Sequence, residues 1–129
     1  MYGRENSSGT YVYFKEHVLE NKDFSSDLQS LPGTAAFVNA VSKDKNAIGF
    51  GGAAYAKGIK DLAVRKDPDS KAFLPNRHNI ESGEYPISRF LYMYTRKKPE
   101  GNVKSFIDWA LSKKGQSIVA EVGYFPVKK

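Results

Sequence analysis

The residues with the clearest potential for chemistry are Arg4, Ser8, Gly9 and Thr10, near the start of the chain. Polar capping residues precede an aromatic segment here, so we expect a helix to begin near Ser8 or Gly9. A helix N-terminus presents unpaired backbone N–H groups and the positive end of the helix dipole. Gly9 lets the backbone approach a ligand closely, while the Ser8 and Thr10 hydroxyls add rotatable donors. With the planar fork of the Arg4 guanidinium, this combination indicates a site for a small oxyanion.

A simpler interpretation of these residues stays open at this point. A serine-rich cap with an incidental arginine explains them too, and the spacing alone favours it because such caps are common. Glu5, which follows Arg4 directly, is expected to be a solvated side chain without a role in the site.

Other motifs give weaker signals. Gly49-x-Gly51-x-x-Ala54 formally fits the dinucleotide fingerprint. That fingerprint needs a longer preceding strand and a crossover helix, whereas Lys57-Gly58 interrupts the helix early. We therefore expect these glycines to serve close backbone packing.

Hydrolytic and metal chemistry have little support. His17 and His78 are the two histidines, cysteine is absent, and no Gly-x-Ser-x-Gly or His-Glu-x-x-His pattern occurs. Tyr92 and Tyr94 have rings that can stack on bases, but alternating aromatics in a strand are more often core or sheet-face residues. We expect no catalytic residues, no metal and no cofactor, and hence a protein that is not an enzyme.

Hydrophobic periodicity and turn residues predict the elements that carry these side chains. Residues 2–10, 23–33 and 66–84 are expected to be loops, the last of them an irregular excursion over the surface. Gly33-Thr34 is expected to open the second helix. The predicted helices run from Ser8 or Gly9 to about Glu20, from Ala35 to about Ser42, from Val103 to Leu111 and from Ser117 to Val122. The predicted strands are Ala47–Phe50, Ile59–Arg65 and Ile87–Thr95. This interleaving favours the α/β class.

Composition limits the function further. The chain has 129 residues, 40% of them hydrophobic, which indicates one folded domain and excludes a disordered or collagen-like chain. A net charge of +6 favours an anionic partner: nucleic acid, an acidic membrane surface or a small oxyanion. Because the basic residues are scattered and form no stripe, nucleic acid is not expected as a partner, although a basic interaction or nucleic-acid-binding domain remains the alternative.

Residues 4–10, Arg-Glu-Asn-Ser-Ser-Gly-Thr, resemble the phosphate-contacting loop of the PstS-type phosphate-binding proteins of bacterial ABC transporters. Further segments occur in the order that this family shows, and together they cover nearly the whole chain. They are residues 46–50, 82–89, 91–95, 106–109, 112–116 and 123–127.

The resemblance implies an α/β chain that forms the C-terminal part, one lobe, of a type II periplasmic-binding-protein fold. It implies inorganic phosphate as ligand, with Arg4, Ser8, Gly9 and Thr10 as this lobe's contacts. Residues 1–85 are then the ligand-binding lobe, and residues 86–129 hold a return strand and C-terminal helices. The implied partners are the membrane permease of the transporter and a complementary N-terminal lobe, or a second copy of this chain in its place.

Family members are longer, and the resemblance implies that their first half supplies further donors and an aspartate that accepts a proton from phosphate. No residue here corresponds to that aspartate, so a fragment without independent binding function is a further alternative. The family is periplasmic or extracytoplasmic. In this chain we expect no signal peptide, because Met1–Arg4 is not followed by an apolar stretch.

Overall fold

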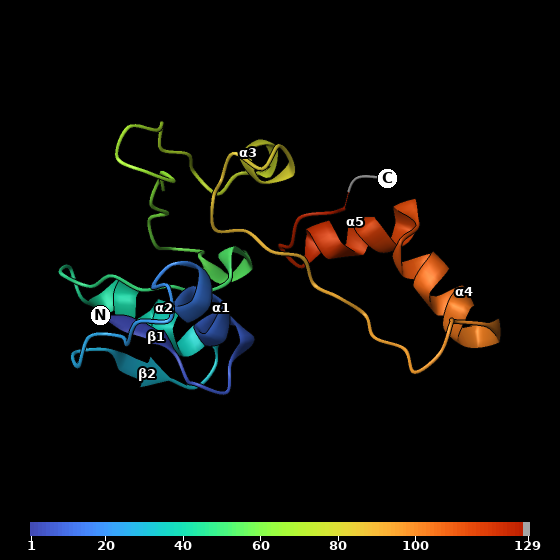
Figure 1. The fold of residues 1–129 in the computed structure, drawn as a ribbon, viewed down its shortest axis with the longest axis horizontal. Coiled ribbons are helices and arrows are strands. Elements are labelled where there is room, and N and C mark those ends of the chain that lie inside the picture. The colour runs from blue at the N-terminus through green and yellow to red at the C-terminus, as the bar shows by residue number, and fades with distance from the viewer. Residues whose placement is uncertain (128–129) are drawn as a thin grey trace. The chain divides into compact units, whose positions relative to one another are not determined.

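A computed structural model describes residues 1–127 (Figure 1). The chain divides into two compact units, Met1–Leu62 and Ala63–Lys129. The predicted assignment of residues 1–85 to a ligand-binding lobe concerns the complete protein and stays a prediction. The elements are β1 (Tyr2–Arg4), α1 (Gly9–His17), β2 (Gln29–Leu31), α2 (Thr34–Lys43), the 3-10 helix η1 (Ala53–Tyr55), α3 (Arg77–Glu81), α4 (Gly101–Ala110) and α5 (Lys113–Glu121).

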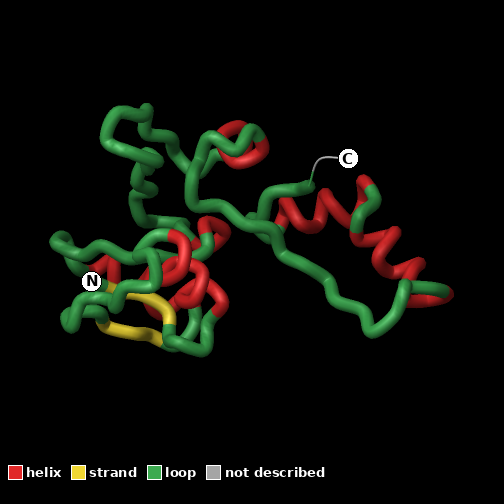
Figure 2. Tube along the Cα trace, in the orientation of Figure 1, coloured by secondary structure: helices red, strands yellow, loops and turns green. Residues whose placement is uncertain are grey.

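The sheet of the first unit is small and parallel. β1 pairs with β2 in the register Tyr2 to Gln29 and Arg4 to Leu31, and Tyr2 also forms a parallel bridge to Gly49. Figure 2 shows these two strands in yellow. The predicted loops over residues 2–10 and 23–33 were therefore wrong where they include β1 and β2, and the predicted strand 47–50 is reduced to the bridge at Gly49. A strand of three residues is too short to show a recognisable alternation of apolar and polar residues. Such strands are identified by the strands they pair with.

Aromatic side chains form the core of the first unit. Phe37 of α2 and Phe50 are its buried hydrophobic residues. Phe14 of α1 stacks on Phe50 with ring centroids 4.3 Å apart, and Phe24 lies 5.4 Å from Phe50 in the same way. Both helices pack against β1, so this aromatic cluster holds the start of α1 next to the end of β1.

Helix α1 ends earlier than its sequence predicts. Phe14 lies on the packed face as expected, but Val18 is the C-cap and is exposed. Glu20 and Asn21 adopt positive φ angles of 52° and 65°, a conformation that stops a helix. The predicted end at Glu20 was therefore wrong.

Within residues 63–127, the second unit contains three helices and little sheet. The predicted strand 59–65 is reduced to an antiparallel bridge between Val64 and Phe73, and the predicted irregular excursion contains α3, which Asn76 caps. Residues 87–95 form no strand, although the sequence predicts one; Figures 1 and 2 show them as a drawn-out loop between α3 and α4.

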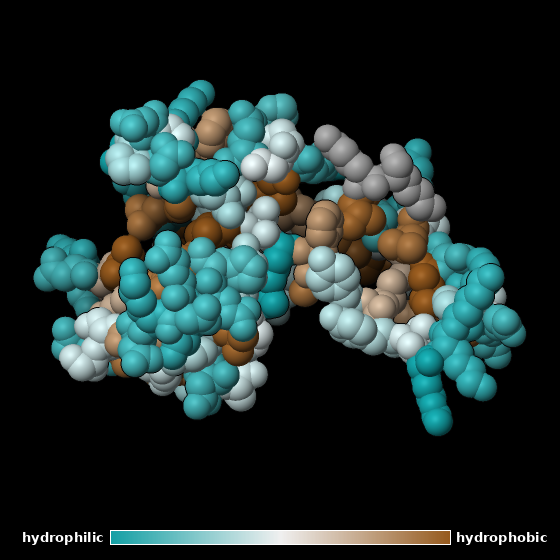
Figure 3. Space-filling view, viewed as in Figure 1, coloured by the Kyte–Doolittle hydropathy of each residue, from teal (hydrophilic) through white to brown (hydrophobic). Residues whose placement is uncertain are grey.

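Helices α4 and α5 form a tight pair. Helix α4 begins before the predicted Val103, and α5 begins at Lys113 rather than at Ser117, because Ser112 caps it by accepting a hydrogen bond from the Gly115 N–H. Apolar side chains of both helices remain on the surface, among them Phe106, Trp109 and Ile118. Figure 3 shows hydrophobic residues in brown on the visible surface.

Candidate anion-binding site

The four residues expected to contact an oxyanion lie together in the first unit. Arg4 is the last residue of β1, Ser8 is the N-cap of α1, and Gly9 and Thr10 are the first residues of that helix. A turn closed by the Ser8 N–H, which donates to the Glu5 carbonyl oxygen at 2.9 Å, links the strand to the helix. The chain thus passes from strand to helix within a few residues, and the arginine stays beside the helix N-terminus.

Ser8 holds the cap geometry. It is buried, and its Oγ accepts a hydrogen bond from the Thr10 N–H at 3.2 Å. The N–H groups of Gly9 and Tyr11 belong to the first turn and have no partner within the helix. Because the first turn of α1 contains no acidic residue, the positive end of its dipole is not neutralised locally.

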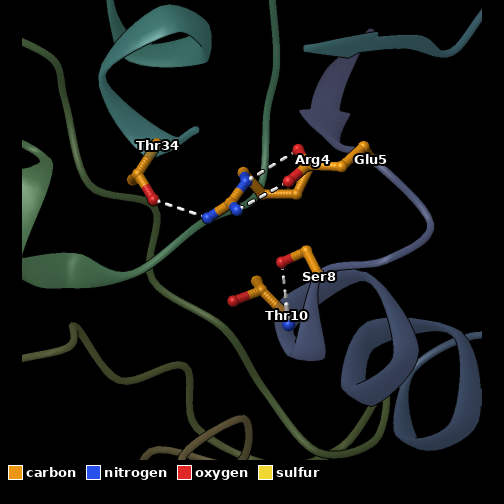
Figure 4. A network of polar contacts seen from close by, with 5 residues as sticks. All are labelled: Arg4, Glu5, Ser8, Thr10 and Thr34. Carbon is orange, nitrogen blue, oxygen red and sulfur yellow. Dashed lines mark hydrogen bonds and ion pairs between the residues drawn. The ribbon is translucent and has the colours of Figure 1, made fainter. Parts of the chain in front are cut away.

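The guanidinium of Arg4 is fixed from two sides (Figure 4). Its Nε and Nη2 donate to the two carboxylate oxygens of Glu5 at 3.1 and 2.9 Å, and its Nη1 donates to Thr34 Oγ1 at 2.9 Å. The prediction that Glu5 is simply solvated was wrong, because this carboxylate orients the arginine. These contacts use three of the N–H donors and leave the others open to a further acceptor.

This pairing stabilises the charged forms of both residues. The hydrogen bond from Arg4 lowers the pKa of Glu5 from 4.5 to about 2, and backbone hydrogen bonds at Glu5 and Gly33 act in the same direction. The same hydrogen bond raises the pKa of Arg4 above its ordinary value. The guanidinium is therefore a permanent positive charge at this position.

We expect the stability of the first unit to decrease as the pH falls from 4.5 toward about 2. The folded-state pKa of Glu5 is depressed, so its contribution is complete above the unfolded-state pKa and disappears as the carboxylate becomes protonated. Urea unfolding followed by circular dichroism across this interval measures the effect. Glu5→Gln should flatten the pH dependence, whereas Glu16→Gln, at an exposed glutamate of α1, should leave it unchanged. The pKa of Asp23 is also lowered by Lys15, so the difference between the two variants is the relevant quantity.

Thr34 is the site residue that sequence reasoning missed. It is the first residue of α2, whose N-cap Gly33 provides no side-chain hydrogen bond, so N–H groups of a second helix start lie beside Arg4. The sequence contains a signal for it: Gly33-Thr34 opens a predicted helix just as Gly9-Thr10 does. The sequence gives no sign, however, of the long-range contact that brings the two helix starts to the same arginine, Arg4.

The other candidates have structural partners. His17 has its Nδ1 3.2 Å from the Tyr13 carbonyl oxygen and stacks on the Tyr13 ring, and His78 faces Glu84 with 3.8 Å between Nε2 and Oε2. Gly51 lies against the buried Phe37 ring, as expected for close packing. Within residues 1–127, no three histidine, cysteine, aspartate or glutamate side chains gather into a group suited to a metal ion.

Residues 1–114 match the family model described as a PBP superfamily domain. The chain belongs to this family. This PBP-family chain is 38% identical to the phosphate-binding protein PstS of Pseudomonas aeruginosa and 35% identical to the protein SphX of Synechococcus elongatus, in each case over 98% of its own length. It covers 41% and 39% of those proteins, so it spans about two-fifths of the length of these curated relatives. The resemblance to part of a PstS-type protein is therefore confirmed.

Solved structures of the same kind support the fold. A protein described as a possible phosphate binding protein from Planctomyces limnophilus matches with a TM-score of 0.74 and 34% identity, over 98% of this chain and 48% of that one. PstS from Borrelia burgdorferi matches with a TM-score of 0.68 and 28% identity, over 99% of this chain and 53% of that one. The predicted α/β class, one lobe of a type II periplasmic-binding-protein fold, is confirmed. None of the helices within residues 1–127 has the length and apolar character needed to cross a bilayer.

Proposed function

We propose that this PBP-family chain binds inorganic phosphate and forms part of the extracytoplasmic substrate-binding protein of a phosphate ABC transporter. Its role is binding and not catalysis. The observation that carries the proposal is the convergence of Arg4, Ser8 and Thr10 at the uncompensated N-terminus of α1, in a chain similar to phosphate-binding proteins.

Each of these residues has a defined part in the proposed contact. The N–H donors of Arg4 not used by Glu5 and Thr34 would donate to two phosphate oxygens, forming charge-assisted hydrogen bonds. The backbone N–H of Gly9 would donate to another, since a glycine at the start of a helix lets a ligand approach closely. Ser8 Oγ accepts from Thr10 N–H and keeps its own hydroxyl proton for a ligand, and the Thr10 hydroxyl is a further donor.

Glu5 and Thr34 are positioning residues in this proposal. A free arginine side chain loses rotamer entropy when it binds a ligand, but here the salt bridge and the Thr34 contact already restrict it. A preorganised donor binds at lower entropic cost. The negative charge of Glu5 lies on the Nε side of the guanidinium, which leaves part of the Nη side for an anion.

The rest of the site would come from outside this chain. In the complete protein, a second lobe would close on phosphate and bury it, and a membrane permease would recognise the closed state. Charge-assisted hydrogen bonds contribute about 1.5–3 kcal/mol each, so a chain that supplies only part of them should bind weakly.

Calorimetric titration of the 129-residue chain with phosphate and with sulfate tests the proposal. We expect weak, saturable binding of phosphate, and sulfate binding of similar strength because the Glu5 carboxylate at the proposed site already accepts two hydrogen bonds from Arg4. Neither sub-micromolar phosphate binding by a monomer nor a complete lack of binding is compatible with a partial site. The titration is repeated at higher ionic strength, since non-specific polyanion binding by scattered lysines weakens steeply with salt.

A further inference from the structure

Three segments of the first unit run parallel to one another and end at the same edge of the sheet. β1 pairs with β2, and residues 48–50 pair with Tyr2 of β1. In that second contact the Tyr2 N–H donates to the Ile48 carbonyl oxygen at 2.9 Å, and the Phe50 N–H donates to the Tyr2 carbonyl oxygen at 3.3 Å. The carboxyl ends of the three segments therefore lie together, and open α/β sheets bind their ligands at this edge.

Each of these segments continues into a helix at the same edge. β1 leads to α1 and β2 leads to α2, and the first residues of both helices already belong to the proposed site or contact it. Residues 48–50 lead to η1, which packs against α2. The topology therefore brings a third segment of the chain, η1, to the edge where the phosphate would bind.

Tyr55 is the residue of η1 with a side chain suited to binding an anion. From the bridge at Gly49, the parallel register places Gly51 opposite Arg4. The Tyr55 ring lies close to this point, because a Cβ added at Gly52 would be 3.9 Å from its Cδ2. The two residues that precede Tyr55 in η1 are alanines, whose side chains form no hydrogen bonds.

The electrostatic environment of Arg4 also places Tyr55 near the site. The pKa of Arg4 is raised chiefly by its hydrogen bond to Glu5, and an electrostatic interaction with Tyr55 acts in the same direction. Such interactions are largely screened beyond about 10 Å at moderate ionic strength, so the two side chains lie near each other. Within residues 1–127 the Tyr55 hydroxyl has no hydrogen-bond partner, and the residue is 48% exposed. This hydroxyl can therefore bind a ligand.

We propose that the Tyr55 hydroxyl donates a hydrogen bond to the phosphate held by Arg4 and the start of α1. This inference rests on the proposed function and adds a contact from a third segment of the chain. A tyrosine side chain has few rotatable bonds, so its hydroxyl is positioned at low entropic cost. Because a hydroxyl donates equally to either anion, this contact should serve phosphate and sulfate alike.

The first test is the affinity of Tyr55→Phe for phosphate, measured from the amide NMR signals of residues 8–10. This change keeps the ring and removes one hydrogen bond to a charged group, so it should raise the dissociation constant by about tenfold. Tyr124→Phe removes the hydroxyl of a tyrosine of the second unit, 40% exposed, and should leave the constant unchanged. An unchanged constant for Tyr55→Phe, or an equal loss in both variants, overturns the inference.

The second test uses the unmodified chain with isotope-labelled tyrosine rings. The chain has eight tyrosines, and the ring signal that is missing from Tyr55→Phe belongs to Tyr55. We expect this signal to move along the same saturable curve as the amide signals of residues 8–10. A ring signal that stays fixed while those amides saturate overturns the inference and leaves the proposed function in place. If neither the ring nor the amides respond, phosphate does not bind at α1, and the proposed function fails together with this inference.

Discussion

Arg4→Ala is expected to lower the affinity of the chain for phosphate by about 2–5 kcal/mol, a loss of at least about thirtyfold. The Arg4 side chain is only 20% exposed, Glu5 and Thr34 hold its guanidinium in one orientation, and the hydrogen bond to Glu5 raises its pKa. Removing it eliminates the one formal positive charge assigned to the site and the donors that match two phosphate oxygens. Calorimetric titration of the variant measures the effect.

Two further variants separate the contact from a general loss of charge. Arg4→Lys keeps the charge but not the planar fork, so it should recover only part of the affinity. Arg65→Ala, which removes a surface arginine that donates to the Pro68 carbonyl oxygen, should bind phosphate like the unmodified chain. If Arg4→Ala keeps its affinity while circular dichroism shows an intact fold, the loop is only a helix cap.

Gly51→Ala is expected to destabilise the first unit by about 1–3 kcal/mol, because it overpacks the core. A Cβ at this position would lie 2.1 Å from Cε1 and Cζ of Phe37. Phe37 is only 4% exposed. The ring therefore cannot move aside into solvent, and the change must displace either α2, which carries Phe37, or the backbone at Gly51. Urea unfolding followed by circular dichroism gives the difference in free energy of unfolding.

Gly52→Ala is the matched control for this change. A Cβ at Gly52 would meet only Tyr55 Cδ2, at 3.9 Å, and the Gly52 φ of −68° suits any residue. We expect this neighbouring substitution to be neutral or to stabilise by up to about 1 kcal/mol, through the lower entropy of the unfolded chain. Equal destabilisation by both substitutions would contradict the packing described for Phe37.

The sequence was sufficient to predict where α1 and α2 begin, although it missed the Ser112 cap of α5 and the short helix α3. Ser8 caps α1 as expected, and Phe37 is the buried residue of α2. The strands were harder to predict because their identity depends on partners. Tyr2–Arg4 looks polar and irregular but pairs with β2 and, at Tyr2, also with Gly49. Residues 87–95 look like a strand, yet they form none within the described chain.

The part of the candidate site that comes from neighbouring residues in the sequence was predictable. Arg4, Ser8, Gly9 and Thr10 lie within seven consecutive residues, so their proximity follows from the chain itself. The contribution of Thr34 depends on a contact across 30 positions, and the role of Glu5 depends on a side-chain orientation that composition does not reveal. Both are tertiary effects, which sequence periodicity does not report.

The most direct test of the central claim is a two-dimensional amide NMR titration of the chain with phosphate. We predict that the amide signals of Ser8, Gly9 and Thr10 shift together along one saturable curve. The start of α5 is the internal control and should not shift: Ser112 caps it by accepting from the Gly115 N–H, and the helix begins with two lysines. Equal shifts at both helix starts, or saturable shifts that leave residues 8–10 unmoved, would contradict a phosphate site at α1.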